Sequence, residues 1–250
     1  MTSREALAYT RRQHSMQKTE NNHTRKKLAA EFVGTFLLVF AGTGAIIIND
    51  LSGGTVTHIG VAITFGLIVL TMIYTVGDIS GAHLNPAVTF GFYLACQFER
   101  RNVLPYMSSQ LLGAMVASLV LKLMFAQHHT LGATQPSGSV VQSFVLEIVL
   151  SWLLMFVILS ISTGAKEKGV TAGIAVGSTV ALAALFAGPI SGASMNPARS
   201  LAPALLSVHL GNLWIYLTAP FIGATLAVPV CRGVQAEGCC TAIRSAKVCE

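Results

Sequence analysis

Two asparagines, Asn85 and Asn196, occupy matched positions in a duplicated segment. Their side-chain amides could donate hydrogen bonds to the oxygen of a small polar molecule. The two copies cover residues 77–88 and 188–199 and begin 111 residues apart. Eight of their twelve positions are identical, and both contain Ser-Gly-Ala-x-x-Asn-Pro-Ala. Such matched segments indicate an internal duplication, and in a membrane protein they indicate where a binding or conduction site lies.

Each Asn-Pro-Ala motif is predicted to begin a short helix. Asparagine is a favourable N-cap, and proline fits the first helical turn because its φ is already helical and no N–H is lost. We expect helices over residues 86–96 and 197–206, each about 15 Å long. Placed end to end, they would cross about 30 Å, the thickness of the hydrocarbon core, with the motifs meeting at its centre. The motif residues are Asn85, Pro86, Ala87, Asn196, Pro197 and Ala198.

The Ser-Gly-Ala stretch before each motif must return through the membrane in extended form. Backbone groups that are not paired within a helix are tolerated at that depth only where they line a water-filled path or are buried in protein. We therefore predict a pore bordered by the loop residues Gly81, Ala82, His83, Gly192 and Ser194.

The composition indicates an integral membrane protein. The chain is 53% hydrophobic and only 10% charged, whereas soluble domains contain about 25% charged residues. A very apolar soluble domain is disfavoured because apolar runs of about twenty residues recur, the length that spans a bilayer as a helix. An all-α fold follows, because backbone groups in lipid must be satisfied within the segment. The six predicted spans cover approximately residues 28–48, 57–76, 103–126, 141–163, 170–187 and 211–231.

Basic residues are distributed unevenly between the two sides of this six-span arrangement. Fourteen of the sixteen Lys and Arg residues lie in the N-terminal arm, in segments 77–102 and 164–169, or in the C-terminal tail. Loops 49–56 and 127–140 contain none. The positive-inside rule then predicts a multi-pass protein of the cell membrane with both termini in the cytoplasm. The cations flank membrane spans, so the pattern does not indicate nucleic-acid binding.

The duplication extends beyond the motifs to both halves of the chain. Glu31 and Glu147 each precede the motif asparagine of their own half by about fifty residues. Each half contributes three spans, and because three is odd, the second half must be inverted relative to the first. The expected organisation is a polar cytoplasmic arm (1–27), a channel domain (28–231, with repeats at about 28–126 and 141–231) and a cytoplasmic tail (232–250).

With its doubled motif and its first span opening on Ala30 to Thr35 (Ala-Glu-Phe-Val-Gly-Thr), the chain resembles the major intrinsic protein family of aquaporins and aquaglyceroporins. The resemblance covers about residues 28–231. It implies six membrane-spanning helices, two re-entrant half-helices, a pore in every protomer and a homotetramer in the lipid bilayer. It also implies that neutral solutes pass while protons and ions are excluded.

The resemblance places Arg199 at the outer constriction of the pore, where Phe65, Ala184 and Ala193 complete the selectivity filter. Strictly water-selective members of the family typically have a histidine at the position of Ala184, and glycerol facilitators pair Trp with Phe. Small residues at two of the four positions resemble the nodulin-26-like subgroup, as does Tyr216 in the sixth span. Other positions are similar to those of water channels, so the pattern is mixed.

Further polar residues allow more than one interpretation. Glu31 and Glu147 could relay protons, or they could accept hydrogen bonds from the neighbouring re-entrant loops, which their symmetric positions favour. For His83, no second His or Cys ligand is near in sequence, so a structural hydrogen bond is favoured over metal binding. Cys96 and Cys231, like the three tail cysteines, fall on the predicted cytoplasmic side and are expected to be reduced thiols.

The predicted function is a passive channel for water and small uncharged solutes of glycerol size, with urea and neutral metalloid acids as further candidates. The alternatives are a strictly water-selective channel, a proton-coupled secondary transporter and a non-conducting membrane scaffold of the same fold. The sequence contains no nucleophile–base constellation, phosphate loop or metal-ligand set. We therefore expect no enzyme activity, no cofactor and no metal.

Overall fold

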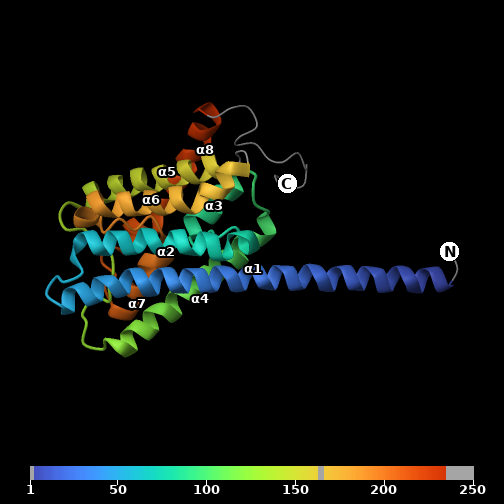
Figure 1. Ribbon diagram of the computed structural model, residues 1–250, viewed down its shortest axis with the longest axis horizontal. Helices are drawn as coiled ribbons and strands as arrows, with labels where there is room; N and C mark the ends of the chain where they lie inside the picture. The colour runs from blue at the N-terminus through green and yellow to red at the C-terminus, as the bar shows by residue number, and fades with distance from the viewer. Residues whose placement is uncertain (1–2, 163–165, 235–250) are drawn as a thin grey trace.

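The computed structural model describes residues 3–162 and 166–234, and the side chains of residues 22–162 and 171–234. These residues form helices and connecting loops without strands, so the predicted all-α fold is confirmed (Figure 1). The helices, in chain order, are α1 (Ser3–Leu51), α2 (Thr57–Ser80), α3 (Pro86–Leu94), α4 (Arg100–Met124), α5 (Val140–Ser162), α6 (Lys166–Ser191), α7 (Pro197–Ser207) and α8 (Leu213–Val234).

Two lengths of helix are present, as the sequence predicts. α3 and α7 contain 9 and 11 residues, so each is about 15 Å long and crosses about half of a bilayer. Both begin at the proline of an Asn-Pro-Ala motif. Among the described residues, six segments are long and apolar enough to span a membrane: Asn22–Leu51, Thr57–Ser80, Arg100–Met124, Val140–Ser162, Thr171–Ser191 and Leu213–Val234.

The first helix extends well beyond its membrane span. α1 begins at Ser3, so most of the predicted arm (1–27) continues the helix of the first span, and Figure 1 shows it projecting from the bundle. Lys, Arg, Glu, Gln and Ala are frequent in this arm and are good helix formers, which accounts for the continuation.

The helices pack as an inverted repeat. α1 packs against α2 and α4, and in the same way α5 packs against α6 and α8. Each half-helix packs against a spanning helix of the other repeat: α3 packs against α8, and α7 packs against α4. α2 and α6, which are equivalent in the two repeats, also pack against each other. This arrangement brings the two half-helices into contact between the spans.

Glycines at equivalent positions allow the closest helix crossings. A Cβ atom on Gly113 in α4 would lie 2.3 Å from the Phe32 carbonyl oxygen of α1, and one on Gly223 in α8 would lie 2.3 Å from the Ile148 carbonyl oxygen of α5. These two glycines are 110 residues apart, so both repeats use the same contact. Small residues at such crossings let helix backbones approach closely in a membrane.

Cys96 and Cys231 are both disulfide-bonded, so the prediction of reduced thiols is wrong for these two residues. Cys96 follows α3, and Cys231 lies in the last turns of α8. The Arg232 guanidinium donates to the Leu94 carbonyl at 3.4 Å, so the ends of these helices lie side by side. That proximity depends on the packing of α3 against a helix of the other repeat, which no local sequence pattern reveals.

The first prediction concerns these crossings. Gly113→Ala should lower the thermal unfolding midpoint of the detergent-solubilised protein, because its methyl group would press on the α1 backbone, at a cost of about 1–3 kcal/mol. Gly233→Ala is the matched control, since among the described residues a Cβ there would have no non-neighbouring atom within 4 Å. Equal midpoints for the two variants would contradict the role of Gly113 in the crossing.

Candidate functional site

The two motif asparagines cap their half-helices. The Asn85 side-chain oxygen accepts a hydrogen bond from the Ala87 backbone N–H at 2.9 Å. The Asn196 side-chain oxygen accepts from the N–H groups of Ala198 and Arg199 at 3.0 and 3.3 Å. Both asparagines have extended backbones, as an N-cap requires. The prolines and alanines of the motifs are buried in the first turns that these caps stabilise.

The amide nitrogens of the same asparagines join the two halves of the chain. Asn85 Nδ2 donates to the Met195 carbonyl at 2.7 Å, and Asn196 Nδ2 donates to the Leu84 carbonyl at 2.9 Å. The positive N-termini of α3 and α7 therefore face each other. Each amide nitrogen carries two hydrogens, so one N–H per asparagine remains beyond these bonds. Both asparagines border the same cavity.

The segment before each motif follows a repeated pattern of backbone conformations. Residues with positive φ recur at equivalent positions, and the non-glycine ones each cost about 1–2 kcal/mol of strain. The surrounding structure must hold such residues in place. The positions and φ angles are Gly81 (90°), Ala82 (48°) and Leu84 (51°) in the first half, and Gly192 (82°), Ala193 (42°) and Met195 (53°) in the second.

Glu31 holds the first re-entrant segment. Its Oε1 accepts from the Ser80 hydroxyl at 2.7 Å and from the His83 N–H at 2.9 Å. Its Oε2 accepts from the Leu84 N–H at 2.8 Å and from Gln110 Nε2 at 2.7 Å. The carboxylate is fully buried. Four donors compensate for the loss of water around it.

Glu147 holds the second segment in the same way. It accepts from the Ser191 hydroxyl at 2.7 Å and from the N–H groups of Ser194 and Met195 at 2.9 and 2.8 Å. Neither Glu147 nor Glu31 borders the cavity. Their oxygens already accept hydrogen bonds from the loops, so the geometry favours loop support over a proton relay.

Two tyrosines that sequence reasoning did not identify as supports complete this framework. The Tyr106 hydroxyl donates to the Ser80 carbonyl at 3.0 Å, and the Tyr216 hydroxyl donates to the Ser191 carbonyl at 2.7 Å. Both rings are buried. Tyr216 does not border the cavity, so its place in the sixth span is structural. The tyrosines are 110 residues apart, and searching for pairs at the repeat spacing could have found them.

His83 lies in an aromatic environment beside the cavity. Its ring stacks on Phe92 at a centroid distance of 4.6 Å, and Phe98 and Tyr106 lie at 4.8 and 5.3 Å. Its Nδ1 is 3.1 Å from the Thr89 hydroxyl, whose hydrogen is donated to the Asn85 carbonyl. The predicted structural hydrogen bond is present in this arrangement.

One cavity of about 400 Å³ passes beside both motifs. Of the predicted loop residues, Gly81, Ala82, His83 and Ser194 border it, whereas Gly192 does not. A Cβ on Gly192 would instead lie 3.0 Å from the Thr134 side chain, so this glycine faces the loop between α4 and α5 rather than the cavity.

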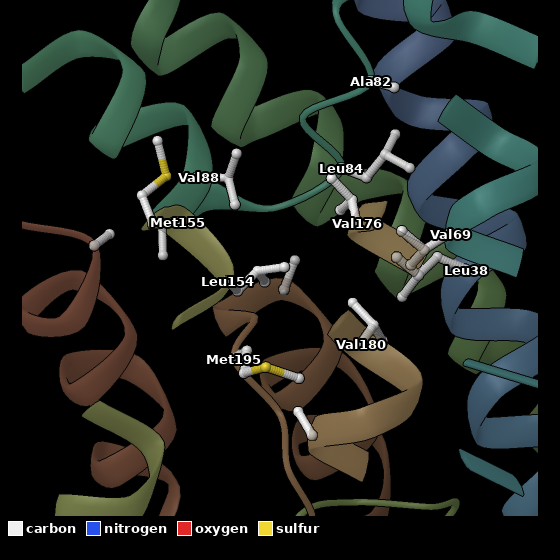
Figure 2. Close-up of a cluster of buried hydrophobic side chains, with 14 of the residues drawn as sticks. Leu38, Val69, Ala82, Leu84, Val88, Leu154, Met155, Val176, Val180 and Met195 are labelled. Carbon is white, nitrogen blue, oxygen red and sulfur yellow. The ribbon is translucent and has the colours of Figure 1, made fainter. Parts of the chain in front are cut away.

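Most of the cavity wall is aliphatic. Figure 2 shows the side chains of one buried cluster, and all ten labelled residues except Met155 also border the cavity. The cluster draws on both repeats, with Leu38 and Val69 from the first and Leu154, Val176 and Val180 from the second. The polar groups Asn85, Asn196, Arg199, His83 and Ser194 face the same space.

The four residues predicted to form the selectivity filter all border this cavity. Arg199 is 2% exposed, and its guanidinium carbon lies 5.2 Å from the centre of the Phe65 ring, within range of a cation–π interaction. Its Nη1 donates to the Gly132 carbonyl at 3.0 Å. Ala184 and Ala193 contribute only methyl groups to the same region.

The loop between α4 and α5 is a part of the site that sequence reasoning missed. Besides the Gly132 carbonyl that binds Arg199, it supplies Thr134, whose hydroxyl donates to the Ser200 hydroxyl of α7 at 2.7 Å. Ser194 also hydrogen-bonds to Ser200. The loop residues have no repeat equivalent and no recognisable motif, so only the folded structure shows that they approach α7.

The arrangement suits transient binding of neutral polar molecules. Asn85, Asn196 and Arg199 present N–H donors to the cavity, and the aliphatic wall cannot replace the hydration of an ion. Where the structure describes side chains, no group of three or more His, Cys, Asp or Glu residues could hold a metal ion.

The sequence is similar to those of known membrane channels. A family model described as Major intrinsic protein matches residues 17–230. Aquaporin NIP1-1 of Zea mays is 49% identical over 200 residues, covering 80% of this chain and 71% of that protein. Probable aquaporin NIP4-2 of Arabidopsis thaliana is 48% identical over 199 residues, covering 79% and 70%.

A solved structure shares the fold. The X-ray structure of the aquaglyceroporin from Plasmodium falciparum superposes with a TM-score of 0.73 at 25% identity, covering 84% of this chain and 94% of that chain. Given the doubled motif, the opposed half-helices and these matches, the chain belongs to the major intrinsic protein family and is an integral, multi-pass membrane protein.

Proposed function

We propose that this protein is a passive channel for water and small uncharged polar solutes up to about the size of glycerol. The observation that carries the proposal is the cavity shared by Asn85, Asn196 and Arg199, opposite an aliphatic wall. A neutral solute exchanges hydrogen bonds with these donors, while its carbon atoms contact the wall. Solutes bound so weakly can also leave, as conduction requires.

Exclusion of cations follows from the opposed half-helices. Each helix N-terminus carries a positive potential equivalent to about half an elementary charge. α3 and α7 direct these potentials at the same point, where the asparagine amides bridge the halves. Arg199 adds a full positive charge nearer the outer end. A proton or metal cation therefore meets a repulsive barrier that water and polyols do not experience.

The width of the outer constriction supports the broader solute range. Ala184 and Ala193 place two methyl groups where larger side chains would narrow the path. Phe65 forms an apolar side and Arg199 a donating side, which suits polyols, urea and neutral hydroxylated acids. The names of the similar proteins include both aquaporins and an aquaglyceroporin, in line with this range.

We further propose the organisation of the channel in the cell membrane. Residues 28–231 form the channel domain, between a cytoplasmic arm (1–27) and a cytoplasmic tail (232–250). Large apolar side chains such as Leu104, Leu123 and Val141 are more than two-thirds exposed in the protomer. They would contact lipid or neighbouring protomers in a homotetramer.

The second prediction concerns pore width. In proteoliposomes measured by stopped-flow light scattering, Ala184→His should reduce glycerol permeability by about tenfold or more while water permeability changes much less, because water needs the smaller opening. Phe186→His is the control, because that side chain is 54% exposed and lies outside the cavity. A wild type that passes water only, or an equal loss of both fluxes in Ala184→His, would overturn the proposed solute range.

The third prediction concerns the central barrier. Asn196→Asp should raise cation or proton conductance, because a carboxylate would offset the positive potential of the half-helices. Dye-based proton flux and bilayer conductance measure the effect, and retained water flux shows that the variant is folded. Asn212→Asp introduces the same charge outside the cavity and should change nothing. Undiminished ion exclusion in a water-conducting Asn196→Asp would argue against the barrier.

The fourth prediction concerns topology. Both termini should be cytoplasmic, because fourteen of the sixteen basic residues fall on that side. Tags at the two ends should resist protease added to intact cells and be digested after permeabilisation. Digestion of either tag on intact cells would show that this terminus lies outside the cell and would contradict the predicted orientation.

A further inference from the structure

In α6, the residue that follows Ala184 lacks the backbone hydrogen bond that its carbonyl would normally accept. Pro189 lies inside α6, and a proline has no backbone N–H to donate to the carbonyl four residues before it. That carbonyl belongs to Leu185. An unpaired carbonyl within a membrane span is costly, because lipid offers no donor.

His58 supplies the missing donor from the neighbouring helix. Its Nε2 lies 2.8 Å from the Leu185 carbonyl oxygen. A carbonyl can only accept, so the hydrogen must be on Nε2. Gly188 leaves the space for the ring, since a Cβ there would lie 2.7 Å from His58 Cε1. The proline, glycine and histidine therefore form one arrangement at the ends of α2 and α6.

The other repeat has no such arrangement. The residues equivalent to Gly188 and Pro189 are Gly77 and Asp78. Asp78 retains its backbone N–H, so the carbonyl four residues earlier keeps its normal donor. Among the residues whose side chains the structure describes, a Cβ on Gly77 would meet one atom within 4 Å, at 3.9 Å. The Gly-Pro pair that needs the His58 donor is therefore found in the half that supplies Ala184, Ala193 and Arg199, and is not part of the shared fold.

The contact joins the two helices that carry Phe65 and Ala184, two residues of the proposed constriction. His58 and Phe65 are seven residues apart on α2, which places them on the same face about 10 Å apart along the axis. Leu185 follows Ala184 directly on α6, and α2 packs against α6. A change at the His58–Leu185 contact would therefore shift Ala184 relative to Phe65.

We propose that His58 is a positioning residue of the outer constriction. Its Nε2–H replaces the donor that Pro189 removes from the Leu185 carbonyl, and it thereby holds the Ala184 turn of α6 against the α2 wall that carries Phe65. This inference rests on the proposed channel function, because its principal readout is solute selectivity. His58 does not border the cavity, so it acts on the solute path only through the helix it holds.

The experiment compares five proteins in proteoliposomes: wild type, His58→Ala, His58→Gln, Pro189→Ala, and the double variant His58→Ala with Pro189→Ala. His58→Ala should change the ratio of glycerol to water permeability by about three- to tenfold, because a carbonyl within a membrane span loses its donor. His58→Gln retains an N–H donor and should partly restore the ratio. Pro189→Ala returns a backbone N–H to Leu185, so the double variant should resemble wild type.

Thr71→Ala is the matched control, because the Thr71 hydroxyl donates to the Leu67 carbonyl within α2 and not to α6. It should leave the ratio unchanged. An unchanged ratio in His58→Ala would overturn the proposal. So would an altered ratio that Pro189→Ala does not restore, because His58 would then act through some group other than the Leu185 carbonyl.

Amide hydrogen exchange distinguishes this outcome from failure of the proposed function. Exchange in segment 186–192 should rise in His58→Ala and return to the wild-type level in the double variant. If wild type passes water only, the proposed glycerol conduction fails. The role of His58 is then still tested by two measurements, the amide exchange of this segment and the water permeability. Wild-type exchange and water flux in His58→Ala would then overturn the inference.

Discussion

Backbone groups within a bilayer must find hydrogen-bond partners inside the protein, and the buried carboxylates of Glu31 and Glu147 meet this requirement for both re-entrant segments. Each segment contains two non-glycine residues at positive φ, which an unsupported chain would avoid. The carboxylates bind N–H groups within these segments and so compensate for the strain. The half-helices can then begin at the centre of the protein, with their N-termini facing each other. The cavity and the proposed electrostatic barrier both depend on that placement.

The two repeats share this support but differ in the residues that face the cavity. The serine at the end of the long helix, the carboxylate, the tyrosine and the capping asparagine recur at equivalent positions. His83 in the first half is replaced by Ser194 in the second, and Val88 is replaced by Arg199. The scaffold is therefore symmetric, while the arginine and the two alanines of the proposed constriction come from one half. Pro189 is likewise found in one half alone, and His58 of the other half compensates for it.

Several buried apolar side chains have two roles in this fold. Leu38, Val69, Val176 and Val180 pack as a core, and they also form the wall of the cavity (Figure 2). In a soluble protein such a cluster would pack completely and leave no space for water or solute. Here it is incomplete on one side, where the re-entrant segments contribute polar residues such as Asn85, Asn196 and Ser194. Gly113 and Gly223, at the crossings of α4 with α1 and of α8 with α5, bring these helices close enough to enclose this space.

The sequence by itself determined the elements and their symmetry. Apolar length defines the six spans, the motif prolines locate the start of α3 and α7, and the odd number of spans per half requires inversion. It also identified Glu31 and Glu147, because they occupy matched positions in the two halves, whereas the four predicted filter residues came from the resemblance to the family. Only the tertiary structure decided which atoms meet: that each asparagine donates to the opposite loop, that Gly132 and Thr134 reach α7, and that Cys96 and Cys231 are disulfide-bonded. The physical reason is that spacing and composition record local preferences, whereas these contacts join segments that approach only when helices of the two repeats pack together.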